Sequence, residues 1–266
     1  MEITIDELKT YIHCPAQYQF RHKMNVPEDT PENIAYSKAL HRTIHYFYYS
    51  VLGGFVPSPK QMKDKWAKIW NEEQDIHFDF TRDFLTEHIA ENTARQRTHE
   101  EQMKKKTIQG FELIHNFHHF NKNNVGIPIA VDHEFKVPIG PVTVVGNFEL
   151  IREVEDERDG KKYVEIVDFK TGPDNRGDFL KDNDLIMTIM SYAFRNLFQS
   201  SEDRLVYNHI KTGKQSYTYR NDNDYKRMEA IVTSVAEGIL AKNYIPRETF
   251  MCRACPFQDE CDAIQF

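Results

Sequence analysis

Cysteines near both ends of the chain are the first residues whose types and spacing could do chemistry. The chain has four cysteines, and three of them form a Cys252-x2-Cys255-x5-Cys261 pattern. The fourth, Cys14, precedes a proline about 240 residues earlier. Thiolates bind zinc or iron–sulfur clusters, and both commonly take four cysteines. The spacing therefore predicts that the two ends of the chain meet at one thiolate-ligated centre.

A second set of reactive residue types lies in the middle of the chain, where Gly146-x-x-Glu149 is followed by Asp168-Phe169-Lys170. Residues two apart in a strand share a face, so Asp168 and Lys170 project together, and a hairpin can bring Glu149 alongside. Two carboxylates and a backbone carbonyl, that of Phe169, suit Mg²⁺ or Mn²⁺. With a metal-bound water and a nearby lysine, this set predicts phosphodiester cleavage. A carboxylate-x-Lys step by itself also occurs on solvated edge strands.

The elements that must position these residues follow from the periodicity of apolar residues. Helical patterns cover residues 4–24, 32–52, 60–121, 179–198 and 222–242. Strand patterns with turn residues between them cover residues 129–137, 142–154, 163–170, 205–207 and 215–219. The stretch 60–121 contains no proline and is rich in Lys, Glu and aromatic residues, so we interpret it as a helical insertion.

Composition limits the classes of function. A net charge of −7 argues against wholesale coating by nucleic acid, although a local basic groove remains compatible with it. The best local basic candidates are Lys104 to Lys106 and the pair Arg95 and Arg97, which fit a solvated helix face equally well. Neither an apolar run of membrane-spanning length nor a secretory signal is evident, so we expect a cytoplasmic protein with reduced thiols and no membrane association. No G-x-x-x-x-G-K-[ST] loop occurs, so DNA unwinding would require a partner such as a helicase.

The order of these motifs resembles the RecB-type branch of the PD-(D/E)XK nucleases, which includes the AddB nuclease domain and the CRISPR-associated iron–sulfur exonucleases. That family combines Tyr-x-x-Cys-Pro, an early His, Gly-x-x-Asp, Asp/Glu-x-Lys, Gln-x-x-x-Tyr and a final cysteine triplet. The matching positions here are Tyr11 to Pro15, His41, Gly146 to Glu149, Asp168 to Lys170, Tyr192, and Cys252, Cys255 and Cys261. The chain departs from the pattern at three positions, with Glu149 in place of Asp, Thr188 in place of Gln, and Ser37 in place of Gly.

The resemblance implies an α/β fold with a restriction-endonuclease-like core, in which helices flank a mixed central sheet. It implies a single nuclease domain over 1–266 that contains the insertion 60–121 and ends in a cluster-binding segment, 244–266, pairing with Cys14. The implied activity is that of a metal-dependent exonuclease acting on DNA ends or single strands, with a role in repair or recombination. The implied catalytic residues are Glu149, Asp168, Lys170 and Tyr192; the implied ligands of Mg²⁺ or Mn²⁺ are His41, Glu149, Asp168 and Phe169; and the implied ligands of a 4Fe-4S cluster are Cys14, Cys252, Cys255 and Cys261.

Several alternatives stay open at the level of sequence. His41 and His45 lie four residues apart, which also fits structural histidines of a helix. Aromatic residues of the insertion either stack on bases or pack between helices; they include Trp66, Trp70, Phe78 and Phe80. The cysteines would equally serve zinc or remain unligated. The chain as a whole could be a catalytically impaired DNA-end-binding or assembly subunit, or a zinc-stabilised interaction domain.

Overall fold

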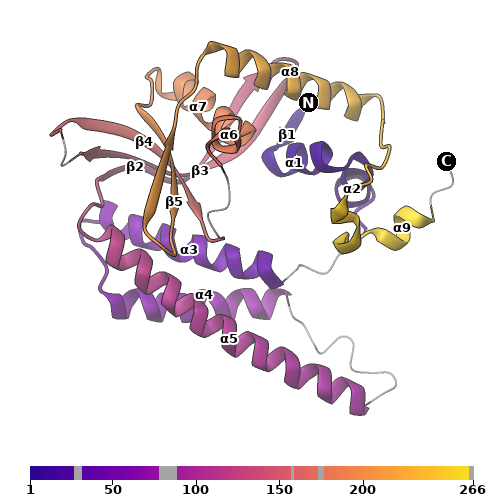
Figure 1. Cartoon of the computed structure of the whole chain (residues 1–266), viewed down its shortest axis with the longest axis horizontal. Helices are drawn as coiled ribbons and strands as arrows, with labels where there is room; N and C mark the ends of the chain where they lie inside the picture. Colours follow the sequence, from indigo (N-terminus) through magenta and orange to yellow (C-terminus); the bar gives the residue numbers. More distant parts are fainter. Residues whose placement is uncertain (27–31, 78–88, 157–158, 173–176, 264–266) are drawn as a thin grey trace.

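The molecule consists of one mixed β-sheet between two layers of helices (Figure 1). The computed structural model describes residues 1–26, 32–77, 89–156, 159–172 and 177–263. One apolar core lies between the sheet and the helices α1, α7 and α8, and a second lies between the opposite face and α3, α4 and α5. This arrangement confirms the α/β fold with a mixed central sheet flanked by helices.

In the described part of the chain, six strands form the sheet in the order β1-β3-β4-β5-β6, with β2 paired to β3 outside this path. Their bounds are β1 Glu2–Thr4, β2 Ile127–Ile139, β3 Val142–Glu155, β4 Lys162–Lys170, β5 Arg204–His209 and β6 Lys214–Thr218. The β2–β3, β3–β4 and β5–β6 pairs are antiparallel, whereas β1–β3 and β4–β5 are parallel. Because β2 occupies one edge of the long strand β3, both β1 and β4 pair along its other edge.

The described helices are α1 Ile5–His13, α2 Pro15–Tyr18, α3 Glu32–Leu52, α4 Pro59–His77, α5 Ile89–Asn121, α6 Asp178–Asp182, α7 Leu185–Phe198, α8 Asp222–Leu240 and α9 Gln258–Asp262. A turn of π-helix follows α2, and a 3-10 turn precedes α9. Across these described segments, none of the helices combines the length and apolarity that crossing a bilayer requires.

The single helix predicted over residues 4–24 is wrong, because the segment is divided. The residues directly before Ile5 form β1, and α1 then begins with a capping box. In this box Thr4 Oγ1 accepts a hydrogen bond from the Glu7 amide, and the Glu7 carboxylate accepts one from the Thr4 amide. The helix ends at Cys14, whose backbone is extended (φ −156°), and Pro15 starts α2. A residue before proline is pushed out of the helical region, which explains the break.

The helix predicted over residues 179–198 is also two helices. Asp184 lies between α6 and α7, and its side chain accepts hydrogen bonds from the amides of Ile186 and Met187. An aspartate that caps a helix in this way marks the start of that helix. Because the apolar periodicity continues across Asp184, the prediction missed this N-cap inside the segment.

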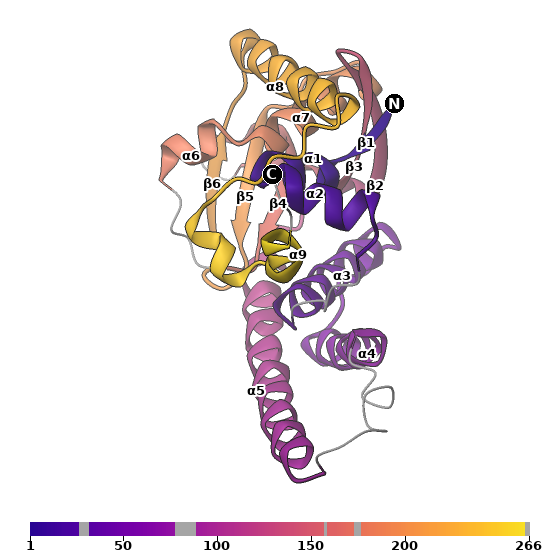
Figure 2. The same ribbon diagram turned by 90° about the vertical axis from the view of Figure 1, so that its right-hand side faces the viewer.

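The predicted insertion 60–121 consists of α4 and α5, which pack against α3 beneath the sheet (Figure 2). Trp66 and Trp70 are fully buried there, and the indole of Trp66 donates to the carbonyl of Thr107. These two tryptophans therefore pack between helices and are not available to stack on bases. Phe78 and Phe80 lie outside the described residues.

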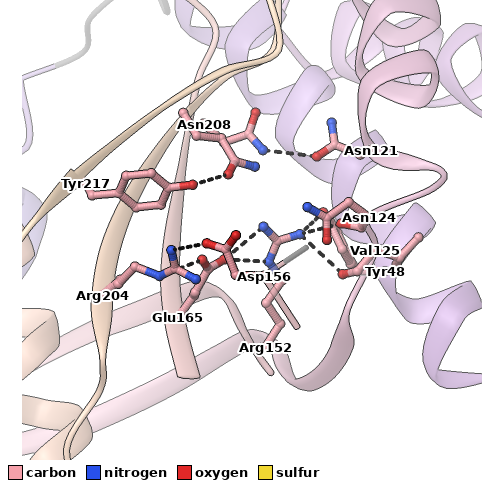
Figure 3. A network of polar contacts seen from close by, with 11 residues as sticks. Tyr48, Asn121, Asn124, Val125, Arg152, Asp156, Glu165, Arg204, Asn208 and Tyr217 are labelled. Atoms are coloured by element: carbon pink, nitrogen blue, oxygen red, sulfur yellow. Dashed lines mark hydrogen bonds and ion pairs between the residues drawn. The ribbon is translucent and has the colours of Figure 1, made fainter. Parts of the chain in front are cut away.

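A buried network of ion pairs links three neighbouring strands near the start of β4 (Figure 3). Glu165 on β4 is paired in register with Arg152 on β3 and with Arg204 on β5. Its carboxylate accepts from Nε and Nη2 of Arg152 at 3.0 and 2.9 Å and lies 3.3 Å from Nε of Arg204. Asp156 accepts from Nη1 of Arg204 at 3.0 Å. The network therefore contains two arginines and two acids, and it fixes β4 between its neighbours.

Candidate active site and thiolate cavity

The carboxylates and the lysine predicted from the sequence lie together at the end of β4. Leu150 on β3 pairs with Val167, so Glu149 is adjacent to Asp168 at the point where this antiparallel ladder stops. The Glu149 carboxylate accepts from the backbone amide of Phe169 at 2.7 Å. The ammonium of Lys170 forms an ion pair with Asp168. The hairpin thus brings both acids and the lysine into one cluster, as the sequence predicted.

The alternation of β4 aims Asp168 and Lys170 to one side of the sheet. Ile166 packs into the core beneath α1, α7 and α8, whereas the side chain of Phe169 is buried in the opposite core. Asp168 and Lys170 therefore share the face of Ile166. Any contribution of Phe169 to a metal site is limited to its backbone, because its ring packs against Tyr48 at 5.8 Å.

His41 completes the cluster from α3. Its Nδ1 lies 2.8 Å from a carboxylate oxygen of Glu149, so one oxygen of Glu149 meets the imidazole and the other meets the Phe169 amide. His45, one turn further along α3, lies 3.6 Å from Asp132 instead. The structure thereby separates the two histidines: His41 joins the carboxylates and His45 does not contact them.

The pKa values of the two acids are shifted in opposite directions. Burial opposes ionisation of Glu149, but the charge and hydrogen bond of His41, with the Phe169 amide, outweigh it and lower the pKa of Glu149. Burial and then the negative charge of Glu149 raise the pKa of Asp168 to about 6, despite the opposing effect of Lys170. Burial also opposes protonation of His41, but the charge of Glu149 raises its pKa. Two carboxylates crowded together in this way match the preference of a hard divalent cation for oxygen ligands.

The cluster lines a cavity of about 380 Å³ whose described walls come from six elements, α1, α3, β3, β4, α6 and β5. Besides Glu149, Asp168 and Lys170, the lining residues include Lys9, Ser37, His41, Lys181, Tyr207 and His209. Tyr207 and His209 lie opposite Asp168 and Lys170 in the β4–β5 register. The Lys170 ammonium lies 5.2 Å from the centre of the Tyr207 ring. Sequence reasoning missed Tyr207 and His209; the predicted strand, residues 205–207, contains Tyr207 but stops short of His209, which lies at the end of β5.

Tyr192 and Thr188 lie on α7 and are not among the described residues that line this cavity. The ring of Tyr192 packs beside Tyr225, with 5.9 Å between ring centroids. Thr188 is buried, and its hydroxyl accepts from the Arg220 guanidinium at 2.7 Å. The structure therefore does not bring Tyr192 to the carboxylates, and a catalytic role for it stays a prediction.

All four cysteines line a second cavity, of about 450 Å³, between the start and the end of the chain. Cys14 lies at the junction of α1 and α2, which Figure 1 shows beside the C-terminal segment that contains α9. Burial, followed by the neighbouring Cys14, Asp262, Cys255 and Cys252, raises the pKa of the Cys261 thiol. The structure thus brings together the cysteines that are far apart in sequence.

The walls of this thiolate cavity combine backbone donors and an apolar base. The amides of Arg247 and Thr249 donate to the sulfur atoms of Cys14 and Cys252 at 3.5 and 3.4 Å. Phe257 is fully buried and packs on Phe20, with 5.7 Å between ring centroids. The cavity therefore combines hydrogen-bond donors directed at sulfur with an apolar base.

Among the residues that the structure describes, no three His, Cys, Asp or Glu side chains are grouped closely enough to hold a single metal ion. In the cavity at the end of β4, the carboxylates are engaged by His41, Lys170 and the Phe169 amide.

Comparison with known proteins identifies the family. The model of the PD-(D/E)XK nuclease superfamily matches residues 2–262. The chain therefore belongs to the PD-(D/E)XK nuclease superfamily. Among solved structures, it is similar to the one described as "Crystal structure of SSO0001", with 12% identity, a TM-score of 0.39, and coverage of 100% of this chain and 87% of that chain. No curated protein matches the sequence.

Proposed function

We propose that this chain is a metal-dependent deoxyribonuclease of the RecB-type branch, acting on DNA ends or single strands. The observation that carries this proposal is the grouping of Glu149, Asp168, Lys170 and His41 in one cavity. The pKa of Asp168, raised to about 6 by burial and by Glu149, supports it, because a divalent cation would relieve the repulsion between the two carboxylates. Glu149 and Asp168, with the Phe169 carbonyl and His41, would hold Mg²⁺ or Mn²⁺.

The residues of the site would have different roles in cleavage. A bound cation supplies an acidified water and positive charge near the phosphate. His41 lowers the pKa of Glu149 and orients its carboxylate through the ion pair at 2.8 Å. Lys170 forms an ion pair with Asp168, and from that position it would offset the charge that develops on phosphate oxygens during displacement. Packing of Lys170 over the Tyr207 ring limits its rotamers and so holds that charge in place.

Cleavage assays with end-labelled single-stranded and double-stranded DNA in Mg²⁺ and Mn²⁺ test the assignment. Asp168→Asn and Lys170→Met should each lower kcat by at least about 100-fold, the scale of losing one group that stabilises a transition state. Exposed Lys68→Met on α4 serves as the control and should leave cleavage unchanged. Cleavage that survives both active-site substitutions would refute this site. DNA-end binding without any cleavage would instead identify an impaired or assembly subunit.

For the thiolate cavity, we propose that Cys14, Cys252, Cys255 and Cys261 hold a 4Fe-4S cluster with a structural role. The support is that all four thiols line one cavity of about 450 Å³, with amides donating to two of the sulfurs. Such a cluster would join the start of the chain to its end. Anaerobic purification followed by iron and acid-labile sulfide analysis tests this. A colourless protein that contains zinc and no iron would overturn the cluster.

A further inference from the structure

A buried lysine in the cavity at the end of β4 has no role in the proposed chemistry so far. Lys181 on α6 is 5% exposed, yet it lines the same cavity as Glu149, Asp168 and Lys170. Its ammonium donates to the hydroxyl of Ser216 on β6 at 3.0 Å. Burying a lysine opposes its charge, so its position facing a polar cavity requires a physical reason.

The position of Lys181 is fixed by a second buried side chain, Arg220. The guanidinium of Arg220 donates to the Lys181 carbonyl at 2.9 Å and to Oγ1 of Thr188 at 2.7 Å. It also donates to Oγ1 of Thr218 at 2.7 Å, and Thr218 in turn donates to Asp182 at 2.7 Å. Arg220 thereby ties α6 to α7 and to the end of β6. The short helix is anchored where the lysine side chain enters the cavity.

Both positive and negative side chains line the cavity, so it suits a phosphate anion together with a metal cation. Among the described residues, three lysines line it, namely Lys9, Lys170 and Lys181, together with two carboxylates, Glu149 and Asp168. Each carboxylate has a positively charged or titratable partner, since Lys170 contacts Asp168 and His41 contacts Glu149. Lys181 and Lys9 reach the cavity from two different helices, α6 and α1. Positive charge therefore borders the acidic cluster on more than one wall.

We propose that Lys181 binds a phosphate oxygen of the nucleic-acid backbone and thereby positions the strand over Asp168 and Glu149. This inference rests on the proposed nuclease function and adds a substrate-binding residue that no motif in the sequence marks. A lysine acts on phosphate as a compact point charge, so the contact is independent of base sequence. Lys181 lies in a different element from the carboxylates, so its contribution does not require a bound metal.

Binding of a labelled single-stranded oligonucleotide in EDTA, across a series of salt concentrations, tests the contact directly. Each phosphate contact to a single strand contributes a slope of about −0.7 in log K against log salt. Lys181→Met should weaken binding and reduce the magnitude of that slope by about 0.7. Lys181→Arg, which keeps the charge, should retain the slope of the unmodified protein. Exposed Lys68→Met on α4 is the matched control and should also retain it.

Because Lys181 is buried, its replacement by methionine could prevent folding. Lys181→Gln also removes the charge but can still form a hydrogen bond with Ser216, so it measures the same change in slope. An unchanged slope in the folded charge-removing variants overturns the inference, while cleavage by the unmodified protein leaves the nuclease assignment intact. A protein that neither binds nor cleaves DNA overturns both. Equal loss of slope in Lys181→Arg and Lys181→Met also overturns the contact, because charge would not be its basis.

Discussion

The buried ion-pair network at the start of β4 gives a quantitative test of what holds the sheet together. Substituting Glu165→Gln preserves the size of the side chain but removes the charge that Arg152 and Arg204 share. The side chains of Arg152 and Glu165 are only 1% and 2% exposed, so water cannot replace the lost partner. Two guanidinium groups would remain, with Asp156 as the acid of the network.

The expected cost follows from burial. Breaking a buried ion pair by removing one partner costs about 3–5 kcal/mol, because the remaining charge stays buried without compensation. At roughly 2–4 °C per kcal/mol for a chain of this size class, the melting temperature should fall by roughly 6–20 °C. Thermal unfolding followed by circular dichroism, with urea unfolding at a fixed pH, measures both quantities.

The same strands supply a matched control. Glu153 on β3 pairs with Lys162 on β4 at 2.8 Å, but these side chains are 34% and 65% exposed. Glu153→Gln makes the same chemical change in a solvated pair and should cost less than about 1 kcal/mol. Equal losses of stability in Glu165→Gln and Glu153→Gln would show that burial does not determine how much the network contributes to the free energy of unfolding.

Three further predictions concern the metal site, the thiols and the helical layer. Since the pKa of Asp168 is raised to about 6 and that of His41 is also raised, protons compete with the cation at both residues, so the apparent affinity for Mn²⁺, measured by titration calorimetry, should fall by at least about tenfold per pH unit below pH 6; the fall should be shallower in Asp168→Asn, and an equal fall in both proteins would contradict the role of Asp168. Cys14→Ser should lower bound iron to less than about half of the unmodified level, because a four-cysteine cluster loses one ligand; retention of all iron would contradict the ligand set. Gly110→Ala should destabilise the fold by about 1–3 kcal/mol in urea unfolding, because an added Cβ would lie 2.0 Å from a ring carbon of Trp66, and a neutral result would show that α4 and α5 can separate at no cost.

Strand periodicity was sufficient to predict that Glu149, Asp168 and Lys170 lie together at the end of β4. The alternation in β4 placed Asp168 and Lys170 on one face, and the hairpin placed Glu149 next to them. These relations are local, since they depend on the two-residue period and a short turn. The same reasoning predicted the strand of residues 142–154, which the structure shows as Val142–Glu155.

The parts that could not be predicted depend on single capping residues and on tertiary contacts. Apolar periodicity continues across Asp184, so the break between α6 and α7 required knowledge that Asp184 bonds the next amides. The position of Lys181 depends on Arg220, which is distant in sequence and makes five hydrogen bonds to backbone and hydroxyl groups. No periodic pattern encodes such a contact.

The helix α1 belongs to both cavities of the molecule. Lys9 lines the cavity of the carboxylates, while His13 and the following Cys14 line the cavity of the thiols. Tyr11 is buried between these positions, and the whole helix is nine residues long. A single short helix therefore supplies side chains to both cavities, so the packing that holds it against the sheet serves both of them.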